Sequence, residues 1–414
     1  MPQLSELGPP SALAGEHHDA TNLSDVPGHF SAAEFFAGIG LVRIGLEAAG
    51  ISVAWSNDFE PRKISMYKRR FGASQTTHVL VEGDVANVVG ADIPLVDIAW
   101  ASSPCTDLSM AGGRLGLDGS KSAAFWHFTR VIEQMKTRPE MLVLENVDGL
   151  ATSHGGNDMR AAIRAFNELG YSVDLLSLDA RRFTPQSRPR IFLVACKTPL
   201  QGARHDGEPS VLRPAWTGKF FDDPQLRMHQ FPLPSPPENL TDGLKGEVQV
   251  LPGSDSRWWP DTRVELFEAS LSEVQRLRIS HLKKSRRLSY RSAYRRMRNG
   301  VPAWEVREDG LAGCLRTIRG GSSRQALVVI GNGKLRVRWM TPREYARLMG
   351  APDYPLSGLG ISQALTGFGD AVSVPVVSWL AANYFRPHLL RVSAALAELN
   401  VERGTEGAEQ TSAA

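Results

Sequence analysis

The chain has 414 residues, of which 42% are hydrophobic and 22% charged, and its net charge is +3. That length suits two or three domains, and the composition allows a substantial core without demanding an acidic partner. The three cysteines, Cys105, Cys196 and Cys314, exclude a disulfide framework or a CxxC zinc pattern, and no apolar run approaches the ~18 residues of a membrane span. We therefore expect a cytoplasmic protein without a metal site, in which Cys196 is a core residue.

The first part of the chain alternates between two kinds of pattern. Residues 1–29, rich in Pro, Gly, Ser and His, predict a disordered N-terminal arm. Beyond them, continuous apolar runs predict strands at 31–38, 51–57, 95–103, 140–146 and 190–197, and helical spacing occurs at 40–50, 60–72, 123–137 and 159–170. Continuously apolar strands between helices indicate an α/β fold with a mainly parallel sheet over residues 30–198.

The pattern changes near Thr198. Prolines cluster at 231–240, periodicity weakens, and tryptophans and arginines accumulate, which predicts a smaller, irregular domain over residues 199–337. Helical spacing returns at 341–350 and 371–385. We expect residues 338–400 to rejoin the first domain and residues 401–414 to form a flexible tail.

A short glycine pattern lies between the first predicted strand and the first helix, in "FAGIG" from Phe36 to Gly40. Such glycines let a ligand approach the backbone, although many α/β proteins use them only for a tight turn. Asp58 follows the strand predicted at 51–57, and Asp84 follows a further strand expected just ahead of it; at both places a carboxylate can meet ribose hydroxyls. Either could instead cap a helix. Together they favour an adenosine-containing ligand.

A thiol and a carboxyl follow the next two strands. Cys105 comes after Pro104 in a polar loop, just past the apolar run where a core cysteine would lie. Glu145 comes directly after "MLVL". Adjacent parallel strands present their carboxyl ends to one crevice, so both groups should face the same bound molecule. The alternative for Glu145 is a helix cap or a structural salt bridge.

Three polar residues, Gln186, Arg188 and Arg190, alternate just ahead of the strand at 190–197. Alternation places them on one face, where two guanidiniums suit a phosphate or a carboxylate. The alternative is a solvated strand edge.

In order, the blocks "FAGIG", "NDFE", "GDV", "SSPCTDLS", "LENV", "PQSRPR", "TPREYARLMGAP" and "GFGDAVSVPV" resemble those of the DNA (cytosine-5) methyltransferases. The resemblance covers roughly residues 31–198 and 338–385, and the weakly matching stretch between them corresponds to the family's variable target-recognition segment. It implies a Rossmann-like fold that uses S-adenosylmethionine, with a smaller, irregular target-recognition domain.

The resemblance also implies roles for individual residues. Cys105 would add to C6 of a flipped-out cytosine while Glu145 holds its N3 edge, and C5 would then take the methyl group. Arg188 would contact the target base, and Arg190 belongs to the same catalytic group. The cofactor would lie on Phe36, Gly38, Ile39, Gly40, Asp58, Phe59, Asp84, Val85, Pro104, Asp370, Ala371 and Val372, and the nucleic acid on Ser109, Gln186, Arg316, Arg319 and Arg324.

The chain departs from the family pattern at four positions. Thr106 stands where glutamine is usual, Leu41 where glycine is frequent, Asp370 where asparagine is usual and Cys314 where threonine is common. An added carboxylate at Asp370 could weaken cofactor binding, unless its partner also differs. None of the four removes the nucleophile or the carboxyl of Glu145.

Residues 276–298 contain ten Lys or Arg and no Asp or Glu. A run of this kind is usually a solvated face, but it also favours phosphate contact. We expect the protein to be a monomer whose partner is duplex DNA. It would act in a restriction system, in another defence system or in stand-alone marking of DNA. The same chemistry on tRNA stays open, as does a non-catalytic nucleic-acid-binding relative. An NAD-linked oxidoreductase would leave Cys105, Glu145 and the basic run without a purpose.

Overall fold

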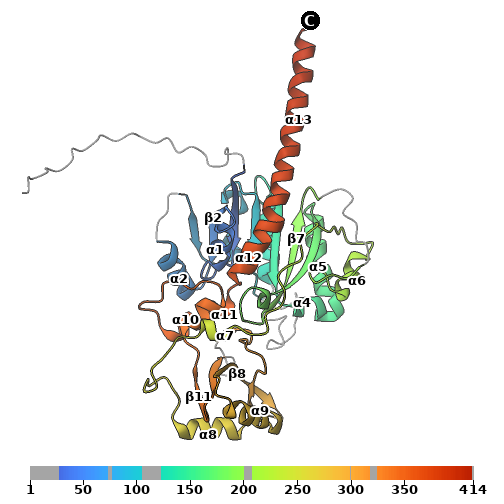
Figure 1. Ribbon diagram of the computed structural model, residues 1–414. Coiled ribbons are helices and arrows are strands. Elements are labelled where there is room, and N and C mark those ends of the chain that lie inside the picture. The colour runs from blue at the N-terminus through green and yellow to red at the C-terminus, as the bar shows by residue number, and fades with distance from the viewer. Residues whose placement is uncertain are drawn as a thin grey trace, which may run out of the picture.

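The computed structural model describes residues 28–72, 77–104, 123–199, 208–298, 300–317 and 324–412. It contains a large domain built on a seven-stranded sheet and a smaller domain built on a four-stranded sheet (Figure 1). Helices α7 (Leu244–Glu247), α10 (Pro342–Leu348) and α11 (Ile361–Asp370) lie between the two (Figure 1).

The large sheet has the strand order β3-β2-β1-β4-β5-β7-β6. Its strands are β1 (Phe30–Phe35), β2 (Ile51–Asp58), β3 (Val79–Glu82), β4 (Ile98–Ala101), β5 (Met141–Asn146), β6 (Ser172–Asp179) and β7 (Pro189–Cys196). The first five are mutually parallel and β7 is antiparallel to both neighbours, which confirms the mainly parallel sheet. The sequence did not predict β6, because "SVDLLSLD" mixes polar and apolar residues.

Two hydrophobic cores cover the faces of this sheet. Helices α3 (Ala123–Glu133) and α5 (Asn157–Glu168) contribute to one core. The other core receives residues from α1 (Leu41–Glu47), α12 (Val374–Leu380) and the π-helical turn Ala381–Phe385. Successive residues of a strand point to opposite faces, so Ala99 and Ala101 join the first core while Ile98 and Trp100 join the second. Burial on both faces is why the central strands are continuously apolar.

Three further helices belong to the large domain or its edges. Helix α2 (Pro61–Phe71) follows β2, and α4 (Gly149–Thr152) and α6 (Gly218–Phe221) are single turns. Cys196 is fully buried at the end of β7, as expected for a core residue.

The smaller domain is more regular than the sequence predicted. Strands β8 (Ser289–Arg298), β9 (Val301–Val306), β10 (Ala326–Gly331) and β11 (Lys334–Trp339) form an antiparallel sheet in the order β11-β10-β8-β9. Helices α8 (Asp261–Ala269) and α9 (Glu273–Lys284) belong to the same domain (Figure 1). The arginines of "SYRSAYRRMR" conceal the strand pattern of β8, in which Ser292 and Ala293 are fully buried.

The C-terminal segment packs against the large domain. The hydroxyl of Tyr354 lies 2.9 Å from the carbonyl oxygens of both Ile39 and Met66, which pins this segment to the turn after β1. Helix α13 (Arg386–Ser412) then extends away from the domain (Figure 1). It includes residues that the sequence predicted as a flexible tail. The helical stretch Ile361–Leu399 is long and apolar enough to cross a membrane, but 67% of its most apolar window is buried inside the protein, as in a core helix.

Candidate active site

The turn after β1 is shaped by residues with a left-handed backbone. Phe36 and Gly38 both have φ of 58°, and Gly40 has φ of 77°. A Cβ on Gly40 would lie 2.4 Å from the ring of Phe71 and 2.8 Å from that of Tyr67, so this glycine allows α1 and α2 to pack closely. A Cβ on Gly38 would meet nothing closer than 3.9 Å. The backbone at Gly38 therefore remains open to a ligand.

Asp58 joins this turn to the end of β2. Its Oδ2 accepts a 2.8 Å hydrogen bond from the backbone N–H of Gly38, and its Oδ1 accepts one of 2.8 Å from Glu60. Each carboxylate oxygen keeps a second lone pair for a further donor. The next side chain, Phe59, is 61% exposed. A carboxylate and an aromatic face thus border the open turn.

Asp84 follows β3 and caps a short 3-10 turn, in which its Oδ1 accepts a hydrogen bond of 2.9 Å from Ala86. Its exposed carboxylate has room for another donor. The predicted cofactor residues Ile39 and Val85 are buried in the core, so only their backbone groups can meet a ligand. Open backbone, an aromatic face and two carboxylates fit the base and ribose of an adenosine ligand.

The departure at Asp370 has a partner that the sequence did not reveal. Lys63 on α2 places its Nζ 2.7 Å from the carboxylate of Asp370, the last residue of α11. Lys63 also lies beside the glycine turn, with its Cδ 4.0 Å from the position of a Cβ on Gly38. Of the neighbouring predicted residues, Ala371 is half-buried and Val372 is buried.

The carboxyl ends of β4 and β5 lie side by side, as the sequence predicted. Ala101 pairs with Leu144 at the end of the two parallel strands. Just beyond, the side-chain amide of Asn146 donates to the hydroxyl of Ser103 over 3.4 Å. Pro104 is the last residue described before a gap, and Cys105, Thr106, Ser109 and Arg319 lie outside the described residues.

Glu145 is 7% exposed at the end of β5 and its Oε1 lies 2.9 Å from Nε of Arg190. The structural salt bridge that the sequence left open as the alternative for Glu145 is therefore present, and its partner is Arg190. A buried carboxylate paired with arginine is held in one orientation by a charge-assisted hydrogen bond. This pair stands at the same edge of the sheet as Pro104.

Arg188 and Gln186 are buried instead of facing solvent. The guanidinium of Arg188 donates to three backbone carbonyls, those of Leu315 at 2.7 Å, Gly369 at 3.1 Å and Ala371 at 2.6 Å. Gln186, expected at the nucleic acid, is fully buried and donates to the carbonyl of Leu348 over 2.9 Å. Both side chains link the small domain or the C-terminal segment to the large domain.

Cys314 lies beside these arginines. Nη1 of Arg188 is 3.6 Å from its Sγ. Burial by itself raises the pKa of the Cys314 thiol, but the charges of Arg188, Arg190 and Arg316 outweigh it and lower the pKa below its ordinary value. A thiol at the position that the family usually gives to threonine is therefore close to the Glu145–Arg190 pair.

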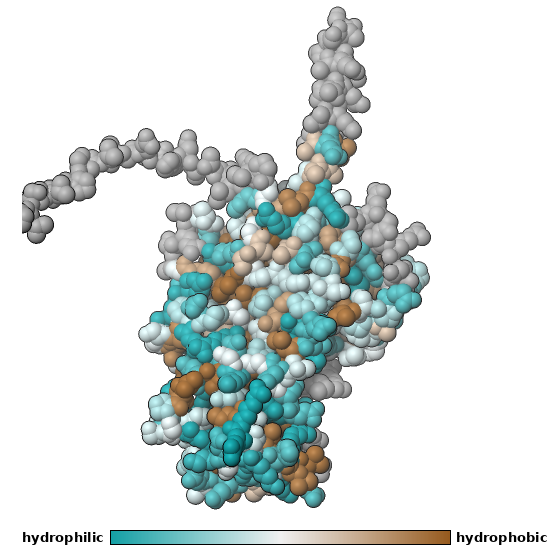
Figure 2. Space-filling view, viewed as in Figure 1, coloured by the Kyte–Doolittle hydropathy of each residue, from teal (hydrophilic) through white to brown (hydrophobic). Residues whose placement is uncertain are grey.

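The basic run is partly compensated in space. Acidic residues from outside the run pair with three of its members: Glu308 with Arg278, Glu268 with Lys283 and Glu305 with Arg296. Of the expected base-reading arginines, Arg316 is exposed and Arg324 half-buried. Hydrophilic residues cover most of the smaller domain on the face shown in Figure 2.

Comparison with known proteins agrees with the fold and the sequence blocks described above. Residues 30–386 match the family model described as C-5 cytosine-specific DNA methylase. The chain is 27% identical over 355 residues to the type II methyltransferase M.HhaI of Haemophilus parahaemolyticus, covering 84% of this chain and 92% of that protein. It is 28% identical over 365 residues to M.HaeII of Haemophilus aegyptius, covering 86% and 92%.

Among solved structures, the fold is similar to that of the S. pombe Dnmt2 methyltransferase, with a TM-score of 0.53 and 17% sequence identity. The match covers 85% of this chain and 97% of the other. At this identity the likeness is evidence of a shared fold alone.

Proposed function

The chain belongs to the C-5 cytosine-specific DNA methylase family, and from that premise we propose that it transfers a methyl group from S-adenosylmethionine to C5 of a flipped-out cytosine in duplex DNA. The observation that carries the proposal is the position of the Glu145–Arg190 pair beside the end of β4 at Ala101, four residues before Cys105. Two reactive groups with different roles are thereby directed to one crevice.

The cofactor site would be the open turn after β1. Gly38 leaves its backbone accessible, Phe36 and Phe59 offer ring faces, and Asp58 and Asp84 accept hydrogen bonds from hydroxyl and amine groups. Lys63 and Asp370 would border the charged methionine end. When bound, S-adenosylmethionine supplies an electrophilic methyl group on a sulfonium.

On the opposite side of the base, the thiolate of Cys105 would add to C6, and the electron pair of the C5–C6 double bond would move onto C5. Glu145 holds the N3 edge of the ring and stabilises the electron-rich adduct, with Arg190 fixing the carboxylate in place. After C5 has accepted the methyl group, a base removes the C5 proton. The C5–C6 double bond then re-forms and the Cys105 thiolate leaves.

A cytosine within a duplex cannot present C6 to a side chain, so the base must leave the stack at a cost of a few kcal/mol. The hydrogen bond between Asn146 and Ser103 ties together the two strand ends that would receive it. Arg316, which is exposed, and Arg324, which is half-buried, are candidates for contact with guanine edges or phosphate.

The test is transfer of a tritiated methyl group to duplex DNA, to tRNA or to no nucleic acid. We expect label in DNA that is lost in Cys105→Ala and retained in Cys196→Ala, whose thiol lies in the core. A 5-fluorocytosine duplex should trap a covalent adduct with the wild-type chain and with Cys196→Ala, but not with Cys105→Ala. Label confined to tRNA, or label in DNA that survives Cys105→Ala, would overturn the proposal.

A further inference from the structure

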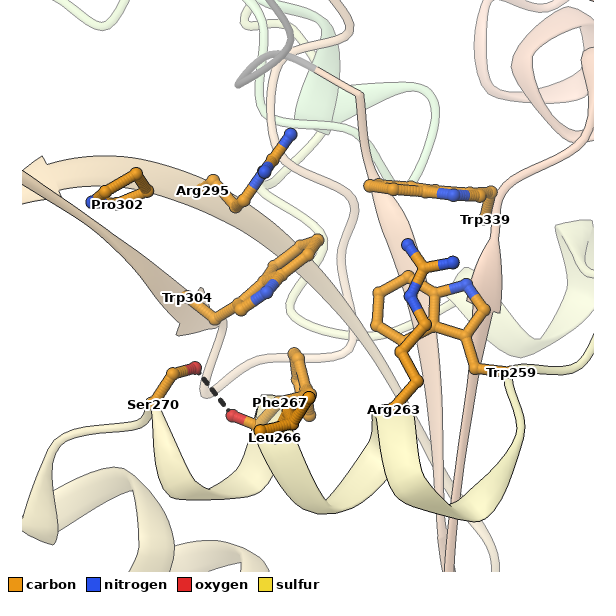
Figure 3. A pocket seen from close by; sticks show the side chains of 9 residues that line it. All are labelled: Trp259, Arg263, Leu266, Phe267, Ser270, Arg295, Pro302, Trp304 and Trp339. Atoms are coloured by element: carbon orange, nitrogen blue, oxygen red, sulfur yellow. Dashed lines mark hydrogen bonds between the residues drawn. The ribbon is translucent and has the colours of Figure 1, made fainter.

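A pocket of about 300 Å³ lies between α8 and one face of the small sheet (Figure 3). Its walls include three tryptophans from distant parts of the chain, Trp259, Trp304 and Trp339, and the arginines Arg263 and Arg295. None of these residues belongs to the motifs that carry the proposed reaction. The volume is within the range of small-ligand sites.

The three indoles form a connected aromatic wall. Their ring centroids lie 5.2–5.6 Å apart, at interplanar angles from 43° to 72°. Trp259 is nearly buried, whereas Trp304 and Trp339 are only half-buried. Two of the three rings therefore retain surface that a flat molecule can cover.

Arginines surround this wall. The guanidinium of Arg263 lies 3.9 Å from the ring centroid of Trp259, that of Arg324 lies 4.9 Å from Trp339, and that of Arg295 lies 5.7 Å from Trp304. Burial and the nearby charge of Arg295 lower the pKa of Arg263. Burial also lowers the pKa of Arg324, where Tyr345 opposes the shift and the charge of Arg263 adds to it. The cations therefore repel one another, and a bound anion would relieve that repulsion.

Two buried donors also have no partner among the residues that the structure describes. They are Nε1 of Trp259, whose side chain is 7% exposed, and Nε of Arg324. A buried N–H without an acceptor is costly. Both donors are covered by surrounding atoms, so a ligand in the pocket meets the exposed rings and guanidiniums instead.

The charge of the pocket decides which flat ligand fits. Aromatic cages also bind quaternary ammonium groups, but the arginines here would repel a cation. A ligand with a planar face and a negative charge matches the exposed tryptophan rings and the arginines of the pocket. A nucleotide has this combination, since its base stacks on aromatic rings and its phosphate pairs with arginine.

We propose that this pocket binds a single unpaired nucleotide of the DNA strand, with the base stacked on Trp304 and Trp339 and the phosphate held by Arg263 and Arg295. The inference rests on the proposed function, because the DNA substrate is what supplies the nucleotide. A paired base has both faces covered by its neighbours, so only a nucleotide outside the stack can enter.

The test compares two fluorescently labelled duplexes of the same sequence, one fully paired and one with a single bulged thymidine, by anisotropy titration of the full chain at fixed salt. We expect the wild-type chain to bind the bulged duplex roughly tenfold more tightly. Trp304→Leu should abolish that preference, Trp304→Phe should restore it, and Arg263→Gln should reduce it.

Arg296→Gln serves as the control, because Arg296 follows Arg295 on β8 and faces the opposite side of the sheet. It should affect both duplexes equally. Arg263 is exposed, so its variant tests the pocket even if a tryptophan variant fails to fold. Equal binding of the two duplexes by the wild-type chain, or a preference that persists in both Trp304→Leu and Arg263→Gln, overturns the inference.

The same preparations are assayed for methyl transfer. Transfer without a bulge preference removes the pocket inference and leaves the proposed function intact. A bulge preference that depends on Trp304, found without methyl transfer, removes the proposed function and leaves the pocket inference intact. Failure to bind either duplex overturns both.

Discussion

The ammonium group of Lys63 lies 2.7 Å from the carboxylate of Asp370, although the two residues are separated by most of the chain. Asp370 ends α11, and Lys63 lies on α2 next to the glycine turn. The lysine therefore neutralises the extra carboxylate that the sequence introduces at the edge of the proposed cofactor site.

We expect Lys63→Met to raise the KM for the methyl donor about fivefold, the effect of losing a partly exposed ion pair worth ~1 kcal/mol. The unpaired carboxylate would repel the donor's own carboxylate. The double variant Lys63→Met/Asp370→Asn should recover the wild-type KM, because it removes the unpaired charge. Steady-state kinetics with varied donor check this, and a double variant as impaired as Lys63→Met would contradict it.

The variants Gly40→Ala and Gly38→Ala should differ sharply in their stability. Both need a left-handed backbone, which costs an alanine about 1–2 kcal/mol. Only at Gly40 does the new Cβ also collide with the rings of Tyr67 and Phe71. We expect Gly40→Ala to lower the free energy of unfolding by about 3 kcal/mol or more, and Gly38→Ala by no more than about 2 kcal/mol. Urea denaturation distinguishes them, and equal losses would show that the rings move aside.

Glu34 makes the stability of the fold depend on pH. It is 1% exposed within β1, its Oε1 has no partner among the described residues, and burial raises its pKa from 4.5 to about 8, with Arg43 opposing the shift. Between these values the unfolded chain releases the proton while the folded chain keeps it. The stability contributed by Glu34 is thus complete below pH 4.5 and is lost as the pH rises to about 8.

We therefore expect Glu34→Gln to be increasingly more stable than the wild-type chain from pH 5 to pH 8, by up to roughly 4 kcal/mol. Urea denaturation across this range measures the difference. Glu133→Gln, at an exposed carboxyl on α3 that is not among the charges acting on Glu34, serves as the control variant. A constant difference between Glu34→Gln and wild type would contradict the prediction.

Arg188 should be essential for joining the two domains. Its guanidinium donates to carbonyls on both the small-domain segment and the C-terminal segment, and the side chain is 3% exposed. Lysine keeps the charge but cannot reproduce a planar fork of donors. We expect Arg188→Lys to lose about 2 kcal/mol or more of stability, because buried carbonyls lose their partners.

Thermal denaturation measures this loss, with Arg182→Lys as the matched control. Arg182 donates to the carbonyl of Pro237 at an exposed position, so its replacement should change stability by no more than about 0.5 kcal/mol. Equal melting temperatures for the two variants would show that Arg188 does not join the domains.

The sequence alone was sufficient to predict a mainly parallel sheet and the shared edge at which its neighbouring strands β4 and β5 end. Strands such as β4 are buried on both faces, which makes them continuously apolar and easy to recognise, and parallel neighbours must present their carboxyl ends together. The positions of Pro104 and Glu145 follow from that rule. The strand β6 and the small sheet were missed, because their polar and charged residues mask the alternation.

Which side chains meet was decided only by the tertiary structure. Lys63 with Asp370, Arg190 with Glu145, and the three tryptophans of the pocket are each brought together from separate elements. A local sequence pattern specifies the face on which a residue lies, but not which distant element packs against that face. Those contacts depend on how whole helices and sheets pack, and so does the burial that removes Gln186 and Arg188 from solvent.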